Sequence, residues 1–68
     1  MFNGRKLRAK MVEKDITNMD LAGILNINPA TLYRKTVGIS DFTRLEIQKI
    51  SEYLALSMQE VKDIFFAE

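Results

Sequence analysis

Residues 28–37 carry polar and aromatic side chains at a spacing that favours contact with a partner over packing in a core. If the segment is helical from Pro29 onward, Leu32 turns inward while Tyr33 and Arg34 turn outward. Arginine can donate two hydrogen bonds to guanine, asparagine can pair with adenine, and an alanine methyl can contact thymine. Tyr33 can reach a phosphate or stack on a base edge. We therefore predict that five residues contact base edges in a DNA groove: Asn28, Pro29, Ala30, Tyr33 and Arg34.

The same segment would also arise if its charges served only to keep an exposed helix soluble. For Arg34 we favour the binding interpretation, because Leu32 and the capping residues leave its face of the helix outward. For Lys35 both interpretations stand, since a lysine stem often covers apolar surface while its charge stays in water.

The composition argues against catalysis and metal binding. The sequence contains no histidine and no cysteine, the commonest general base and the commonest metal ligands among side chains. It also lacks a glycine-rich phosphate loop and a cluster of carboxylates. We therefore expect no enzyme, no cofactor, no metal site and no small-molecule substrate.

The length of 68 residues indicates one domain over residues 1–68. No apolar run is long enough for a signal peptide or a membrane span, so we expect a cytoplasmic protein without a membrane partner. The charge is unevenly divided along the chain. Residues 1–38 carry seven Lys or Arg against three acids, a net +4, whereas residues 39–68 carry three against six, a net −3. This asymmetry suggests one face for a polyanion, although chance in a short chain explains it equally well.

A helix-start pattern occurs four times: an apolar residue, a Ser, Thr or Asn, two free positions, a polar residue and an apolar one. Each Ser, Thr or Asn can act as an N-cap, and Glu46 and Glu60 can complete capping boxes, with Asp20 as a weaker version. Asn3 can cap a fifth helix that precedes these four. The predicted helices cover residues 4–14, 18–25, 29–37, 44–54 and 58–66, which makes the fold all-α.

Helical spacing also predicts which side chains form the core. The joint between the second and third helices is short, so Asn26 is expected in the left-handed conformation, and small Ala22 lets the two helices approach closely. Gly38 suits the left-handed position that ends the third helix. The predicted interior consists of Leu7, Met11, Ile16, Leu21, Ile24, Leu25, Ile27, Leu32, Ile47, Ile50, Leu54, Val61, Ile64 and Phe65.

The stretch from Asn18 to Gly38 resembles the helix-turn-helix of the lambda-repressor-like family, which includes phage repressors and Cro-type proteins. The matching residues are Ala22 in the first helix, Ile27 at the corner, Leu32 in the second helix and Gly38 after it. The remainder of the chain resembles the last two helices of small Cro/repressor-like regulators. The resemblance implies a compact five-helix domain whose recognition helix, 29–37, enters the major groove of DNA.

The resemblance also implies phosphate contacts. Asn18 stands where the family often has glutamine, and Thr43 would present its backbone N–H to a phosphate. The further candidates are Thr31, Lys35 and Ser40, with Arg5, Lys6 and Lys10 extending a basic track. The chain departs from the family at Asn26, where glycine is usual, and at Lys35 and Thr36, where relatives place at least one large apolar residue.

Together these features predict a sequence-specific, DNA-binding transcriptional regulator of phage or prophage type, which the family implies is a repressor. It would bind a double-stranded DNA operator as a symmetric homodimer. The alternative is a protein-binding helical adaptor or antirepressor on the same fold. Phe65 and Phe66 motivate it, because two adjacent aromatic residues cannot easily both face one core, and an exposed apolar spot often marks a protein contact. A homodimer contact through the C-terminal helix would explain the same feature.

Overall fold

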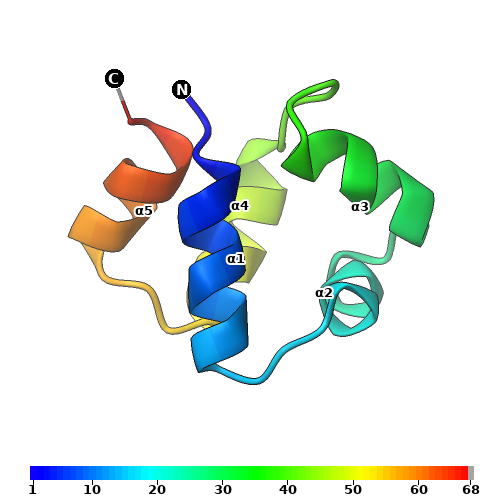
Figure 1. The fold of residues 1–68 in the computed structure, drawn as a ribbon, viewed down its shortest axis with the longest axis horizontal. Helices are drawn as coiled ribbons and strands as arrows, with labels where there is room; N and C mark the ends of the chain where they lie inside the picture. The colour runs from blue at the N-terminus through cyan, green and yellow to red at the C-terminus, as the bar shows by residue number, and fades with distance from the viewer. Residues whose placement is uncertain (68) are drawn as a thin grey trace.

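The computed structural model describes residues 1–67, which form five helices and, within that range, no strand (Figure 1). They are α1 (Gly4–Glu13), α2 (Asn18–Leu25), α3 (Pro29–Thr36), α4 (Arg44–Tyr53) and α5 (Met58–Phe65). The all-α prediction is confirmed, with each helix start where it was expected. Four predicted helix ends, at residues 14, 37, 54 and 66, are one residue too far, because these residues are the C-caps.

The predicted caps explain the helix starts. Asn3, Thr17, Asn28, Thr43 and Ser57 each accept a hydrogen bond from a backbone N–H of the following turn. Three capping boxes are complete, and in each the acidic side chain also accepts the N–H of the cap residue, at 2.8 to 3.0 Å. The short Asp20 side chain closes its box as fully as the two glutamates do.

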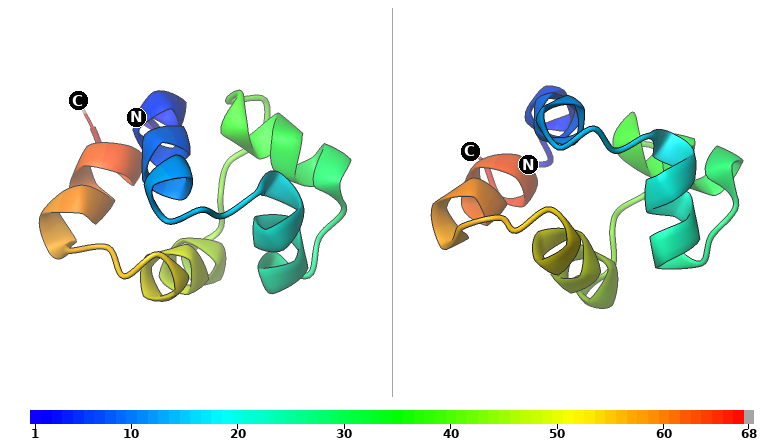
Figure 2. Two further views of the ribbon diagram at one scale, coloured as in Figure 1. Left: turned by 60° about the horizontal axis from the view of Figure 1, so that its bottom comes forward. Right: turned by 90° about the horizontal axis from the view of Figure 1, so that it is seen from below.

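The helices surround one hydrophobic core. Seen from below, α1 and α4 lie on opposite sides, α5 closes one end, and α2 with α3 closes the other (Figure 2). The two chain ends lie together, since the N–H of Asn3 donates to the carbonyl of Ile64 at 2.6 Å. Within the described range, no helix has both the length and the apolar character that crossing a membrane requires.

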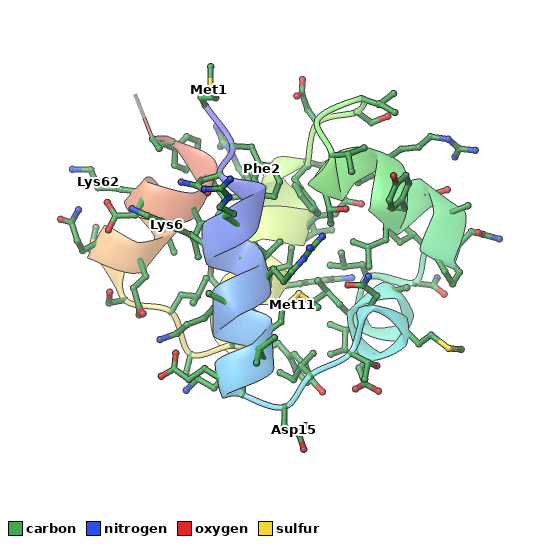
Figure 3. All side chains as sticks on the ribbon, in the orientation of Figure 1. Met1, Phe2, Lys6, Met11, Asp15 and Lys62 are labelled. Carbon is green, nitrogen blue, oxygen red and sulfur yellow. The ribbon has the colours of Figure 1, made fainter. Side chains whose placement is uncertain are left out.

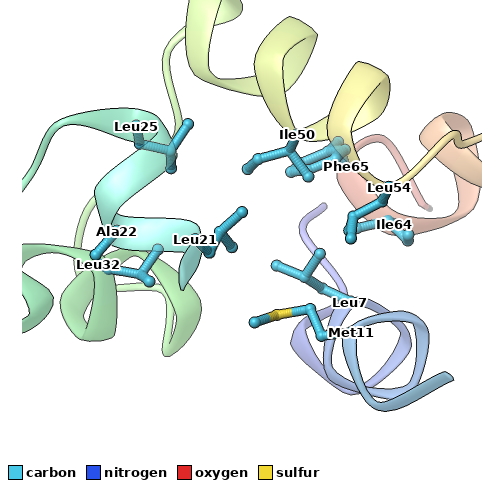
Figure 4. Close-up of a cluster of buried hydrophobic side chains, with 10 residues drawn as sticks. All are labelled: Leu7, Met11, Leu21, Ala22, Leu25, Leu32, Ile50, Leu54, Ile64 and Phe65. Atoms are coloured by element: carbon cyan, nitrogen blue, oxygen red, sulfur yellow. The ribbon is translucent and has the colours of Figure 1, made fainter. Parts of the chain in front are cut away.

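Ten buried side chains form the core cluster in Figure 4. Nine of them were predicted, and the tenth is Ala22, where α2 and α3 approach each other. Four other predicted residues, Ile16, Ile27, Ile47 and Val61, are half-buried against the cluster. Ile24 is half-buried too, but it does not pack on the cluster, so its predicted core position is only partly correct.

An aromatic cluster that the helical spacing did not predict closes the core near the chain ends. The rings of Phe2, Phe42 and Phe65 lie with centroids 5.1 to 5.7 Å apart. Phe2 precedes α1 and Phe42 precedes α4, so neither belongs to a helical pattern. Such tilted and edge-on ring pairs add to stability beyond the apolar area that they bury. They join the N-terminal segment and the α3–α4 connection to α5.

The α2–α3 joint has the geometry expected of a helix-turn-helix. Asn26 adopts the left-handed conformation, at φ 55° and ψ 44°, where asparagine costs less than most residues. The N–H of Ile27 donates to the carbonyl of Ala22 at 3.0 Å, which ends α2 and turns the chain toward α3. After α3, Gly38 has φ 88°, a value that side chains with a Cβ rarely adopt.

Two glycine-to-alanine substitutions are expected to change stability in opposite directions. A Cβ at Gly23 meets nothing within 4 Å, so Gly23→Ala should raise the free energy of unfolding by about 0.5–1 kcal/mol through helix propensity. A Cβ at Gly4 would lie 2.7 Å from the backbone oxygen of Thr36, so Gly4→Ala should lower it by roughly 1–3 kcal/mol. Urea denaturation of both variants checks this, and equal effects would contradict the close α1–α3 approach.

An ion pair fastens α5 to α1. The Lys10 ammonium contacts the Glu60 carboxylate at 2.5 Å and the Glu13 carboxylate at 3.3 Å. The hydrogen bond from Lys10, followed by the N–H of Ser57, lowers the pKa of Glu60 from 4.5 to about 2. The pairing with Glu60 also raises the pKa of Lys10 above 10.5, so both charges are present at neutral pH.

This pair predicts a loss of stability in acid. Because the folded pKa of Glu60 is below its unfolded value, its stabilisation is complete above pH 4.5 and is lost as the pH falls toward about 2. Glu60→Gln keeps an oxygen for the cap but cannot titrate, so its stability should fall less steeply over that range. Asp20 and Glu46 titrate alike in both proteins. Urea midpoints that fall in parallel would contradict the assignment.

Candidate nucleic-acid interface

The outer face of α3 brings together the five residues predicted to contact bases. Asn28, Pro29, Ala30, Tyr33 and Arg34 are all exposed, while Leu32 on the opposite face is 1% exposed. Tyr33 is 61% exposed, a large value for an aromatic side chain in so small a protein. Within residues 1–67, no hydrogen bond or ion pair engages the guanidinium of Arg34 or the hydroxyl of Tyr33. The fold therefore leaves both groups available for a partner.

The cap at Asn28 limits what its side chain can do. Its Oδ1 accepts the N–H of Ala30 at 2.8 Å, which fixes the start of α3. A bidentate pair with adenine needs both the amide oxygen and the amide nitrogen. With the oxygen aimed at the cap, Asn28 is left with the NH₂ group as a donor, so the bidentate contact predicted from sequence does not fit this geometry.

A polar groove separates α1 from α3 and extends to the start of α2. Its volume is about 280 Å³, and its lining includes Arg5, Arg8, Asn18, Tyr33 and Thr36. Arginine and asparagine side chains are common donors to phosphate oxygens. Two arginines and an exposed asparagine thus lie beside the face of α3 that carries Tyr33.

Arg8 was not among the contact residues predicted from the sequence. It lies three residues after Arg5, a spacing that places both on the same side of a helix. That spacing was the available signal, but the track that followed from the family resemblance grouped Arg5 with Lys6 and Lys10.

The structure does not place Arg5, Lys6 and Lys10, the predicted basic track, on a single surface. Lys6 lies on the side of α1 that faces α5, away from α3 (Figure 3). Lys10 lines, together with Lys6, a second groove between α1 and α5, where its ammonium is paired with Glu13 and Glu60. The physical reason is helix geometry, since residues 5 and 8 share one face of α1 whereas residues 6 and 10 share another.

Lys35, a predicted phosphate contact, is buried and does not lie on the exposed face of α3. The residue is 9% exposed, and its ammonium contacts Glu46 Oε1 at 2.8 Å. A lysine whose charge is already paired inside the protein is not free to bind a phosphate. The buried Lys35 stem lies in the part of α3 where the family usually has at least one large apolar residue.

The backbone N–H of Thr43 is likewise occupied. It donates to Glu46 Oε1 at 2.8 Å, and the Thr43 hydroxyl accepts the N–H of Glu46. The capping box therefore already uses the donor that was predicted to bind a phosphate, and the Thr43 contact stays a prediction. Thr31 and Ser40 are half-buried and Asn18 is exposed, and their phosphate contacts stay predictions.

Among the residues that the structure describes, no group of acidic side chains could hold a metal ion.

Comparison with known proteins agrees with this geometry. A family model described as the Cro/C1-type HTH DNA-binding domain matches residues 6–65. The match spans all of α2 to α5 and most of α1, so it covers the α2–α3 joint and, of the residues that line the groove, all but Gly4 and Arg5. No curated protein and no solved structure matches the chain.

Proposed function

Because the chain belongs to the Cro/C1-type helix-turn-helix DNA-binding family, as the match over residues 6–65 shows, we propose that it is a repressor of phage or prophage type. The family supports a DNA-binding transcriptional regulator, and its members are typically not enzymes. In this proposal α3 is the recognition helix and lies in the major groove of an operator. Repression follows where the operator overlaps a promoter.

One observation supports the recognition role of α3 above the others. Tyr33 and Arg34 are exposed on the helix next to the turn, and among residues 1–67 neither side chain takes part in a cap, an ion pair or the core. Arg34 can pair bidentately with guanine, and Ala30 can contact a thymine methyl group. Pro29, at the first helical position, packs against a base edge beside them.

The groove between α1 and α3 supports a phosphate contact next to the bases. When α3 enters the major groove, Arg5, Arg8 and Asn18 lie on the side that faces the DNA backbone. Their donors would fix the orientation of α3 on the duplex, whereas the bases would set its sequence preference. Affinity then comes mainly from the phosphates and depends on salt.

A homodimer is the assembly we propose on the operator. Phe66, directly after α5, is 58% exposed, and Met58 at the start of α5 is 86% exposed. These residues give the C-terminal helix an apolar surface for a second copy. Two copies related by a twofold axis would place their α3 helices in half-sites roughly 34 Å apart, one turn of DNA.

Salt-titrated binding to the DNA that flanks the gene tests the proposal. The protein should prefer one duplex segment over scrambled DNA by about 10³-fold or more, and its affinity should fall linearly with salt on logarithmic axes. A scrambled duplex of equal length and base composition is the matched control. Equal, weak binding to both duplexes at low salt would contradict the proposal.

The same exposed residues leave a second candidate function. A helical adaptor or antirepressor would use Phe66 and the surface of α5 for a protein partner and would show little specific DNA binding. Footprinting on the flanking DNA separates the two candidates, because only the repressor protects a defined segment.

A further inference from the structure

Lys35 is the most enclosed charge of the fold's described part, and three groups from two other segments surround it. Its Nζ donates to Glu46 Oε1 at 2.8 Å and to the backbone oxygen of Asp41 at 3.0 Å. It also lies 5.9 Å from the centroid of the Phe42 ring. The side chains of Lys35 and Glu46 are 10% and 13% exposed, so water screens their pairing only weakly. Lys35 therefore links α3 to the segment before α4 and to α4 itself.

Glu46 does two tasks with one atom. Its Oε1 accepts the N–H of Thr43 in the capping box and the ammonium of Lys35 from α3. Burial raises the pKa of Glu46, but the hydrogen bonds from Lys35 and Thr43 outweigh that effect, so the pKa stays below 4.5. The carboxylate is consequently charged at neutral pH and couples the start of α4 to the end of α3.

The segment that this pair holds in place folds back onto Arg34. The N–H groups of Ile39 and Ser40 both donate to the backbone oxygen of Arg34, at 2.9 and 3.2 Å. Gly38, with φ 88°, makes the reversal possible. Arg34 thus carries its exposed guanidinium on a backbone whose carbonyl is fixed by the segment that Lys35 and Glu46 anchor.

We propose that Lys35 and Glu46 are positioning residues for DNA reading: their buried ion pair fixes the 37–43 segment and thereby the backbone of Arg34. This inference rests on the proposed function, because it assigns the pair a part in sequence preference. Lys35 does not touch the DNA in this account. Losing the pair leaves the phosphate contacts in place but loosens the helix end that presents Arg34.

A direct phosphate contact by Lys35 makes the opposite predictions. It would weaken binding uniformly across sequences when Lys35 is removed, and it would reduce the salt slope by about 1. It would also make Glu46 a competitor for the ammonium, so that Glu46→Gln frees Lys35 and strengthens binding. Positioning predicts weaker operator binding for both variants, with the salt slope unchanged.

The experiment compares Lys35→Met and Glu46→Gln with Lys14→Met, under conditions where all are folded. Lys35→Met keeps an apolar stem, and Glu46→Gln keeps an oxygen for the cap. Lys14→Met removes the same charge from an exposed residue at the end of α1, which lies outside the lining of the α1–α3 groove and outside α5. We expect both test variants to lose about tenfold in the ratio of operator to scrambled-DNA binding, while Lys14→Met keeps the wild-type ratio.

Amide hydrogen exchange on the DNA-free proteins gives an independent readout. Loosening of the 37–43 segment should speed exchange at Ile39 and Ser40 in both test variants, and not in Lys14→Met. Tighter operator binding by Glu46→Gln, or a salt slope lowered by Lys35→Met, would overturn the inference. If the wild type prefers no duplex, the proposed function fails, and unchanged exchange at Ile39 and Ser40 would separately refute the positioning.

Discussion

Leu21→Ala is expected to remove a large part of the protein's free energy of unfolding. Leu21 is 0% exposed and lies at the centre of the core cluster, on the helix that packs against both α3 and α4 (Figure 4). Removing a buried leucine side chain costs about 2–5 kcal/mol, because the lost apolar contacts are joined by a cavity. A chain of 68 residues has a total stability of only about 3–10 kcal/mol. The loss is therefore a large fraction of the total.

The matched control is Leu45→Ala, which removes the same atoms from a helix surface. Leu45 is 59% exposed in the first turn of α4, so its replacement should change the free energy of unfolding by less than about 0.5 kcal/mol. Urea denaturation followed by circular dichroism measures both variants. Similar midpoints for the two would mean that Leu21 packs against a surface loose enough to close the cavity.

Local chemistry explains why the helix starts were predictable. A cap depends on a side chain two or three residues from the N–H that it binds. The caps at Thr17, Thr43 and Ser57 can therefore be predicted from a short stretch of sequence. The same holds for Asn26, whose left-handed conformation is a property of its own backbone. Helical spacing similarly predicted most of the core, since it depends only on which residues share a face.

Contacts between distant segments were harder to predict. Phe2 and Phe42 pack together although 40 positions separate them, and neither lies in a helix whose periodicity could place it. Lys35 looked like a surface charge because its partner, Glu46, lies eleven residues away behind a reversal of the chain. The resemblance grouped Lys6 and Lys10 with Arg5 as one basic track, but the direction of each side chain around α1 places them on different sides of the helix.

Arg34→Ala is expected to have the largest effect on DNA recognition. If Arg34 pairs with a guanine in the operator, its removal should cost about 1–3 kcal/mol in operator binding and relax the preference at that base pair. Binding to scrambled DNA should change little, because the phosphate contacts of the α1–α3 groove remain. Gel-shift or anisotropy titrations on the operator and on single-base variants measure both effects.

Arg8→Ala provides the comparison that gives this result its meaning. Arg8→Ala removes the same charge as Arg34→Ala does. Arg8, however, lines the groove beside α3 and does not lie on α3 itself. Its loss should weaken operator and scrambled DNA by similar factors and lower the salt slope by about 1, as expected for a phosphate contact. Comparing the two variants thus separates base preference from affinity for the phosphates. If Arg34→Ala instead behaves like Arg8→Ala, α3 contributes only charge, and base preference must come from another part of the surface.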